Sequence, residues 1–379
     1  AGNHKEAAAD AYRRLAGVYE YASQFDASIK AYETALNFCR TNGVDMQAQL
    51  CLPCMSWVLF RLGDWKKALN VCKDMIDNPD VFDAIRATAH GVTGLIKGHR
   101  GESKSALLHI QQCQVLGEKE HLAYILLVMP WAKAIIHEYN GEIEAATLQY
   151  QQLMHNWEVS QDQHDVLAGL IAAAAFFGEQ KEDELLNQCL QIFSKIAQST
   201  GNPEAMGGLS FALGEMALLQ KNYEDAASLF DRAVTHFEEL NIPLQNIIGL
   251  YRKGCALKEL SEQTEEALNI LQKALNEARA LGLRPLAAKI EAVLECLQKP
   301  KNKIPFAQTD DSVAASAGLT DRQMEILQEV ADGLSNKEIA SKLYLSTRTV
   351  DMHVGNILNR LNCRSRAEAV KIAAEKGLI

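Results

Sequence analysis

Small residues recur about every forty positions over the first 300 residues, and this period limits the possible folds more than any other feature of the chain. They are Ser28, Ala68, Ala106, Ala146, Ala226 and Ala267, with intervals of 40, 38, 40, 80 and 41 residues. The double interval predicts a degenerate unit centred on Leu186. A fixed period of this length is typical of a repeat array, so the pattern predicts seven units.

The residues around each small position predict a helical hairpin. Ala and Gly let two helices approach closely, while aromatic side chains such as Tyr32 and Phe230 fill the space to the next hairpin. Gly63, Gly101 and Gly141 stand where the first helix of a hairpin needs a left-handed residue at its end. Because one hairpin cannot bury its own apolar face, the hairpins are expected to stack into a superhelix with a concave inner surface.

This pattern predicts an all-α repeat domain over residues 1–298, closed by a capping helix at 284–299. It resembles the tetratricopeptide repeat, in a variant longer than the usual unit of about 34 residues. Projection of that repeat places four aromatic side chains on or near the concave helices: Trp57, Phe60, Trp131 and Phe211. They are candidate ligand contacts. Aromatic residues in repeat helices also commonly belong to the core, and the sequence leaves both interpretations open.

The periodicity stops at "KPKNKIPFAQTDDSVAASAG" (299–318), whose prolines, charges and small residues predict a flexible linker over 299–317. The net charge is -10, but it is unevenly distributed. From Gly318 onward nine Lys/Arg face eight Asp/Glu, which leaves -11 on residues 1–317. Any contact with nucleic acid is therefore expected in residues 318–379.

Four short helices are predicted in this C-terminal segment. Thr320 caps the first helix, which Gly333 ends, and Ser335, Ser346 and Ser365 cap the other three. Two short helices joined by "YLS", with the second one longer, have the geometry of a helix-turn-helix unit at about 336–355.

The second helix of this unit has two distinct faces at about 100° per residue. Four apolar side chains are predicted to face the domain core: Val350, Val354, Ile357 and Leu361. The opposite face and its two shoulders carry six residues: Arg348, Asp351, Met352, Gly355, Asn356 and Asn359. A major groove admits a helix that presents such a face. Met352 can contact a thymine methyl, and Gly355 lets the backbone approach base edges.

Many fixed positions in this segment resemble the LuxR/GerE-type DNA-binding domain of bacterial regulators. The matching positions are Leu319, Thr320, Arg322, Gly333, "SNKEIA" (335–340), Leu343, Ser346, "TV" (349–350), His353, "NI" (356–357), Leu361, Arg364, Ala367 and Val370. The chain departs from the commonest pattern of the family at Gln323, Asp351 and Gly355.

We expect DNA contacts from fourteen residues: Ser335, Asn336, Lys337, Ser346, Thr347, Arg348, Thr349, Asp351, Met352, His353, Gly355, Asn356, Asn359 and Arg364. Asp351, a carboxylate beside a polyanion, has three open interpretations. It accepts from a cytosine amino group, positions Arg348, or is a solvated residue near a helix N-terminus. His353 is either a phosphate contact or a core-edge histidine bonded to the protein.

No catalytic or metal-ligating constellation accompanies these patterns, so no enzyme activity, metal or cofactor is expected in this chain. "CLPC" (51–54) lacks a second pair or a βαβ setting, and two small apolar residues in a repeat helix are the better interpretation. Nine scattered cysteines fit a reducing compartment. Since no apolar stretch is long enough to span a bilayer, we expect a cytoplasmic, nucleoid-associated bacterial protein without a membrane partner.

A repeat array joined to a LuxR-type tail resembles the C-terminal half of the large ATP-dependent LuxR (MalT-like) regulators. In that family a nucleotide-hydrolysing domain precedes the repeats, which take part in inducer sensing, and such a domain is expected upstream of this chain. The resemblance implies an effector-responsive transcriptional regulator. Its expected partners are promoter DNA, RNA polymerase, a small-molecule effector or protein on the concave surface, and a second copy in a homodimer or oligomer. The alternative is a scaffold whose array binds a peptide or protein.

Overall fold

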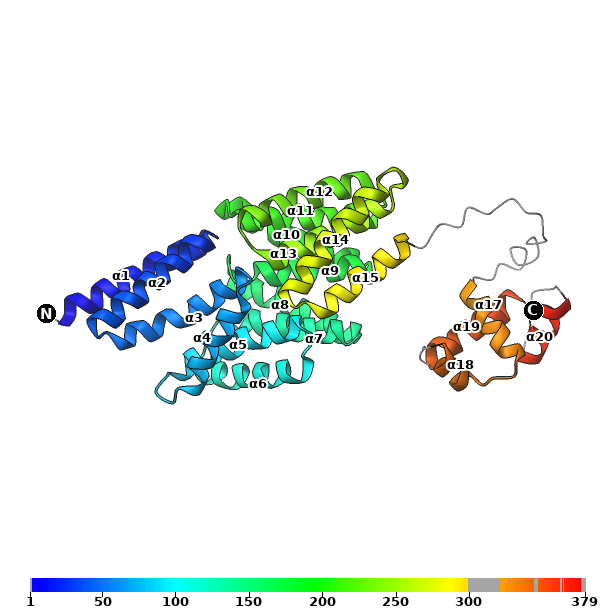
Figure 1. Cartoon of the computed structure of the whole chain (residues 1–379), viewed down its shortest axis with the longest axis horizontal. Coiled ribbons are helices and arrows are strands. Elements are labelled where there is room, and N and C mark those ends of the chain that lie inside the picture. The colour runs from blue at the N-terminus through cyan, green and yellow to red at the C-terminus, as the bar shows by residue number, and fades with distance from the viewer. Residues whose placement is uncertain (1, 299–320, 344–346, 362, 364, 376–379) are drawn as a thin grey trace. The chain divides into compact units, whose positions relative to one another are not determined.

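The computed structural model describes residues 2–298, 321–343, 347–361, 363 and 365–375. The chain divides into two compact units, residues 1–299 and 300–379 (Figure 1). Over the described ranges every regular element is a helix, which confirms the predicted all-α fold. The predicted linker at 299–317 lies outside the described residues.

The first unit is a stack of helical hairpins followed by one helix, coloured blue to yellow in Figure 1. Within residues 2–298 the hairpins are α1 (Gly2–Tyr21) with α2 (Phe25–Asn42), α3 (Asp45–Arg61) with α4 (Trp65–Asp77), α5 (Asp83–His99) with α6 (Ser103–Lys119), α7 (Ile125–Tyr139) with α8 (Ile143–Ser160), α9 (Leu167–Gln180) with α10 (Asp183–Thr200), α11 (Pro203–Leu219) with α12 (Tyr223–Glu239), and α13 (Pro243–Lys258) with α14 (Thr264–Leu281). A 3-10 turn, η1 (Ser261–Gln263), precedes α14, and α15 (Arg284–Gln298) closes the stack. The seven predicted units and the closing helix are confirmed over these residues.

The recurring small position lies in the second helix of every hairpin and is fully buried. Ser28, Ala68, Ala106, Ala146, Leu186, Ala226 and Ala267 are each 0% exposed. Gly63, Gly101 and Gly141 end the first helices with φ of 76°, 74° and 77°, as predicted. Lys181 and Lys221 hold the same left-handed place in later hairpins. In these hairpins the turn therefore adopts this conformation with either glycine or lysine.

The superhelix closes on itself, because the turns of the first three hairpins contact the starts of α11, α13 and α15. Asn202, which caps α11, donates from its side-chain amide to Ser23 Oγ at 3.1 Å. Arg284 at the start of α15 donates to the carbonyl of Arg100 at 2.8 Å. The turn after α3 packs against the start of α13 in the same way. A Cβ added to Gly63 in this turn would lie 2.5 Å from Cγ of Pro243, the first residue of α13. Residues about 180 positions apart thus pack together.

Ion pairs connect the first helices of the later hairpins with one another and with α15. Lys289 of α15 lies 2.8 Å from both Glu138 of α7 and Glu179 of α9. Arg252 of α13 donates to both carboxyl oxygens of Glu215 of α11. Burial raises the pKa of Glu215 to about 7 against the opposing effect of Arg252. These ion pairs therefore join α7, α9, α11, α13 and α15 to one another.

The second unit contains α17 (Asp321–Ala331), α18 (Asn336–Lys342), α19 (Thr347–Arg360) and α20 (Arg366–Glu375). Its core is apolar: Ile326, Leu327, Val330, Ile339, Ala340, Val350, Val354, Ile357, Leu361, Ala369 and Ala373. The core face predicted for α19 is confirmed. Gly333 follows α17 with φ of 87°, and Ser335 and Ser365 accept cap hydrogen bonds as predicted. The predicted caps Thr320 and Ser346 lie outside the described residues.

Candidate functional site

The helix-turn-helix pair α18 and α19 is held to its neighbours by polar contacts as well as by its core. Ser335 and Glu338 form a capping box at the start of α18: the Ser335 N–H donates to the Glu338 carboxylate at 2.8 Å. Arg366 of α20 donates to the Asn336 side-chain oxygen at 2.9 Å and to the Leu334 carbonyl at 2.5 Å. These bonds fix the start of α18 against α20.

The structure describes the predicted DNA contacts to different extents. Four are exposed: Ser335, Lys337, Thr347 and Asn356. Five others lie in the helical backbone of α19, with side chains outside the described part of the structure: Arg348, Thr349, Asp351, Met352 and Asn359. Ser346 and Arg364 lie wholly outside the described residues. Asn336 is half-buried, because it also bonds Arg366 within the domain, a contact that the sequence did not predict.

His353 and Gly355 define the middle of the α19 surface. His353 is half-buried, and its Nδ1 atom is buried without a hydrogen-bond partner among the described residues. The phosphate-contact and core-edge interpretations of His353 both remain predictions. A Cβ added to Gly355 would meet no atom of the described side chains within 4 Å. None of the described side chains therefore covers the backbone of α19 at this position.

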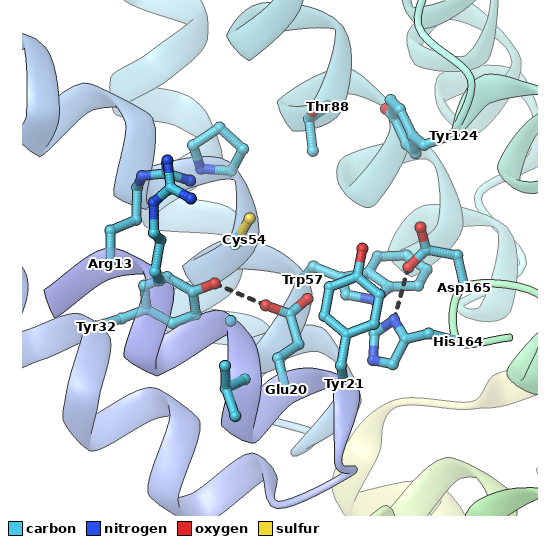
Figure 2. Close-up of a pocket in the computed structure, with 14 residues that line it drawn as sticks. Arg13, Glu20, Tyr21, Tyr32, Cys54, Trp57, Thr88, Tyr124, His164 and Asp165 are labelled. Atoms are coloured by element: carbon cyan, nitrogen blue, oxygen red, sulfur yellow. Dashed lines mark hydrogen bonds and ion pairs between the residues drawn. The ribbon is translucent and has the colours of Figure 1, made fainter. Parts of the chain in front are cut away.

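A cavity of about 770 Å³ lies at the N-terminal end of the array (Figure 2). Helices α1, α2, α3 and α5 line it, together with Tyr124 just before α7 and the loop between α8 and α9. Its lining residues are Arg13, Arg14, Gly17, Val18, Glu20, Tyr21, Tyr32, Pro53, Cys54, Trp57, Thr88, Tyr124, His164 and Asp165. The volume is in the range of pockets that bind small organic ligands.

Three polar side chains of the cavity are buried: Glu20, Tyr32 and His164. Glu20 is 6% exposed and accepts a hydrogen bond of 2.8 Å from the Tyr32 hydroxyl. Burial raises the pKa of Glu20 to about 7, although His164 opposes the shift. His164 Nδ1 lies 3.0 Å from Asp165, and the Tyr21 ring lies 4.9 Å from the imidazole, between ring centroids. Figure 2 shows these groups around one space.

Of the four predicted ligand contacts, only Trp57 lines the cavity. The prediction is wrong for Phe60, Trp131 and Phe211, which are at most 1% exposed. Phe60 and Trp131 pack edge to face with centroids 5.9 Å apart, and Phe211 packs on Phe230 at 5.3 Å. Neighbouring first helices pack so closely that these side chains point between helices and fill the core.

Sequence reasoning missed the charged part of the cavity. Arg13, Gly17 and Glu20 follow the spacing i, i+4 and i+7 and so share one face of α1. That spacing was visible in the sequence. Nothing in the sequence shows that His164, 144 positions after Glu20, lies across from that face.

Within the described ranges, no group of three or more His, Cys, Asp or Glu side chains is arranged to hold a metal ion. The same ranges contain no helix with the length and apolar character that crossing a membrane requires.

Residues 317–373 match the family described as "Bacterial regulatory proteins, luxR family". The Nitrate/nitrite response regulator protein NarP of Escherichia coli is 53% identical over 51 residues, 14% of this chain and 24% of that protein. A Nitrate/nitrite response regulator protein homolog of Haemophilus influenzae is 47% identical over 58 residues, 15% of this chain and 28% of that protein. The chain thus spans about a quarter of the length of these relatives.

The fold resembles that of a Rap protein solved in complex with Competence and Sporulation Factor. The two share 11% identity with a TM-score of 0.53, over 95% of this chain and 99% of that one. At this identity the likeness concerns the fold alone. The sequence match, the capping box and the buried face of α19 together identify the C-terminal segment of this chain as a LuxR-family helix-turn-helix domain.

Proposed function

We propose that the chain is an effector-responsive transcriptional regulator. Residues 1–298 form the sensing domain and bind the effector in the N-terminal cavity, residues 299–317 connect the domains, and residues 318–379 bind promoter DNA. The observation that carries the proposal is a cavity of about 770 Å³ in the same chain as a LuxR-family domain. Contact with RNA polymerase and assembly as a homodimer on DNA are parts of the same proposal.

A relative of the fold supports a sensing role for the array. The Rap protein that the structure resembles was solved with Competence and Sporulation Factor bound. An array of this fold therefore holds another molecule in at least one protein. In the present chain, the cavity with convergent polar groups is the natural place for an effector.

Replacement of Asp351 by Lys should change DNA specificity more than affinity. If the carboxylate accepts from a cytosine or positions Arg348, the variant loses one recognition contact and gains a phosphate-attracting charge. The slope of log affinity against log salt should steepen by about one unit, and discrimination at one base pair should fall by about 1–3 kcal/mol. Selection from random duplexes with both proteins measures this. If the wild type and the variant select the same DNA sites, Asp351 has no role in recognition and is a solvated residue.

Replacement of Gly355 by Ala should stabilise the free protein and weaken its binding to DNA. Ala in a helix interior is favoured by about 1 kcal/mol over Gly, and the added Cβ meets no atom of the described side chains within 4 Å. The same methyl would lie where base edges approach the backbone. Thermal unfolding and fluorescence anisotropy on a selected duplex measure the two effects. A variant that binds DNA as tightly as the wild type would show that α19 makes no close backbone approach here.

Gly17 offers a direct test of the cavity, because the Tyr32 hydroxyl, at 3.9 Å, is the only described group that would lie within 4 Å of its added Cβ. Gly17→Leu should obstruct the cavity between Arg13 and Glu20 while favouring helix α1. A metabolite library screened for shifts in melting temperature should yield compounds that stabilise the wild type but not Gly17→Leu. Leu15→Ala, on the exposed side of α1, is the matched control. The proposal fails if no such compound changes the affinity for the selected DNA.

A second candidate function is a scaffold whose array binds a protein. Four apolar side chains of α1 are exposed: Tyr12, Leu15, Val18 and Tyr21, at 39%, 47%, 64% and 66%. A contiguous apolar patch is typical of protein-binding surfaces. Substitution of Tyr12 and Leu15 by Ser, neither of which lines the cavity, should abolish function in a reporter assay if the array acts as a scaffold. Under the regulator proposal these changes leave the response to a cavity ligand in place.

A further inference from the structure

Helix α1 contributes opposite charges to the two ends of the cavity. Arg13 and Glu20 both line it, as does Gly17 between them. Seven helical residues separate the two charged positions by a rise of about 10 Å and return to nearly the same face. Since Gly17 carries no side chain, the cavity continues along α1 from the guanidinium to the carboxyl group. Figure 2 shows Arg13 and Asp165 on opposite sides of this space.

The basic end carries an excess of positive charge. Arg13 and Arg14 both pair with the single carboxylate of Asp10, at 2.7 Å and 2.6 Å. The Arg13 Nε atom is buried without a hydrogen-bond partner among the described residues. One unit of positive charge and one unused N–H therefore remain for an anionic group of a ligand.

The acidic end is buried and bordered by aromatic rings. The Tyr32 hydroxyl donates to one carboxyl oxygen of Glu20, and no further bond is recorded for the other oxygen among the described residues. Tyr21 and Trp57 line the same end in Figure 2. A buried carboxylate beside aromatic faces favours a positively charged group.

We propose that the cavity selects a zwitterion with an apolar body, whose anionic group lies at Arg13 and Arg14 and whose cationic group lies at Glu20, about 10 Å away along the helix. This inference rests on the proposed function, in which the cavity is the effector site. Val18, Pro53 and Cys54 provide apolar contact between the charged ends. Two sources share this chemistry: a short apolar peptide with free ends, since three extended residues span at most about 10 Å, and a long-chain amino acid.

The test uses the full chain and calorimetry with trileucine and 8-aminooctanoate. A zwitterion should bind, and N-acetylation or C-terminal amidation of trileucine should each weaken binding at least about 10-fold. Preference for trileucine identifies the peptide source, and preference for 8-aminooctanoate the amino-acid source. The proposal is overturned if neither zwitterion binds at millimolar concentration, or if blocked and free trileucine bind equally well.

Two variants test which side chain binds which charged group of the ligand. Glu20→Gln should weaken the binding of free trileucine but not of its acetylated form, and Arg13→Gln should weaken the binding of free trileucine but not of its amide. Arg232→Gln, at an exposed position of α12, is the control. If Glu20→Gln weakens all forms equally, Glu20 supports the fold and does not contact the amine. If a variant unfolds, the acetylated and amidated forms of trileucine still test the proposal, because their binding is measured with the wild-type protein.

A pH series gives a second readout. Glu20 is faced by Tyr32 from α2, by Cys54 and Arg61 from α3, and by His164 and Asp165 from the loop before α9. Because burial raises the pKa of Glu20 to about 7, its carboxyl group loses its proton as the pH rises through 7. The affinity for free trileucine should therefore increase from about pH 6 to a maximum between about pH 7 and pH 8, and decrease at higher pH as the α-amine of the peptide loses its proton. The Glu20→Gln variant should lose this increase.

The outcomes separate this inference from the function on which it rests. If a zwitterion binds at these residues but leaves DNA affinity unchanged, the ligand class holds and the regulator proposal fails. If an uncharged compound occupies the cavity and changes DNA affinity, the regulator proposal holds and the ligand class is wrong.

Discussion

Replacement of Arg61 by Met is expected to lower the free energy of unfolding of the array by about 3–5 kcal/mol. Arg61 of α3 pairs with Glu204 of α11, and both side chains are 0% exposed. The substitution leaves a buried carboxylate without its counter-charge, which is far more costly than the loss of a surface contact. Urea denaturation followed by circular dichroism measures the loss.

Two matched variants separate the buried charge from a general loss of packing. Arg61→Met combined with Glu204→Leu should recover most of the stability, because an apolar pair of similar volume has no charge to compensate. Lys67→Met breaks an ion pair with Glu33 whose side chains are 43% and 48% exposed. It should cost less than about 1 kcal/mol. If the double variant is no more stable than Arg61→Met, the carboxylate is not the cause.

The change Gly63→Ala is expected to destabilise the array by about 2–5 kcal/mol. A left-handed conformation costs an L-residue about 1–2 kcal/mol, and φ at Gly63 is 76°. The added Cβ would also lie 2.5 Å from the ring of Pro243, and such overpacking costs about 1–3 kcal/mol. The cost of overpacking against Pro243 arises only if the turn at Gly63 packs against α13, as it does when the superhelix closes on itself.

The same substitution at Gly141 is the control for this contact. Gly141 has φ of 77°, but a Cβ there meets no atom of the described part of the chain within 4 Å. Gly141→Ala should therefore cost only the conformational part, about 1–2 kcal/mol. Equal losses of stability in the two variants would mean that the turn at Gly63 does not pack against α13 in solution.

The local features of the fold were predictable because short-range physics determines them. The forty-residue period marks the helix pairs, and the positive φ of Gly63, Gly101 and Gly141 follows from the geometry of a helix end. The core face of α19 follows from the spacing of its apolar residues alone. Each of these depends on residues within a few turns of one another.

The cavity and the closure depend on contacts that no local pattern contains. Arg61 and Glu204 are 143 residues apart, and the separation of Glu20 from His164 is similar. The superhelical twist, which brings these pairs together, is a sum of small rotations between hairpins. The same twist decides that Phe60 and Trp131 point into the core while Trp57 lines the cavity.

DNA binding by the full chain and by a chain ending at residue 299 tests the central claim most directly. Fluorescence anisotropy on a selected duplex is recorded over a series of salt concentrations. We predict that the full chain binds with an affinity that falls steeply as salt increases, since most contacts are to phosphates, and that the shortened chain, whose retained residues carry the acidic part of the charge, does not bind. Equal binding by the two chains, or an affinity indifferent to salt, would contradict the assignment of DNA binding to the C-terminal domain.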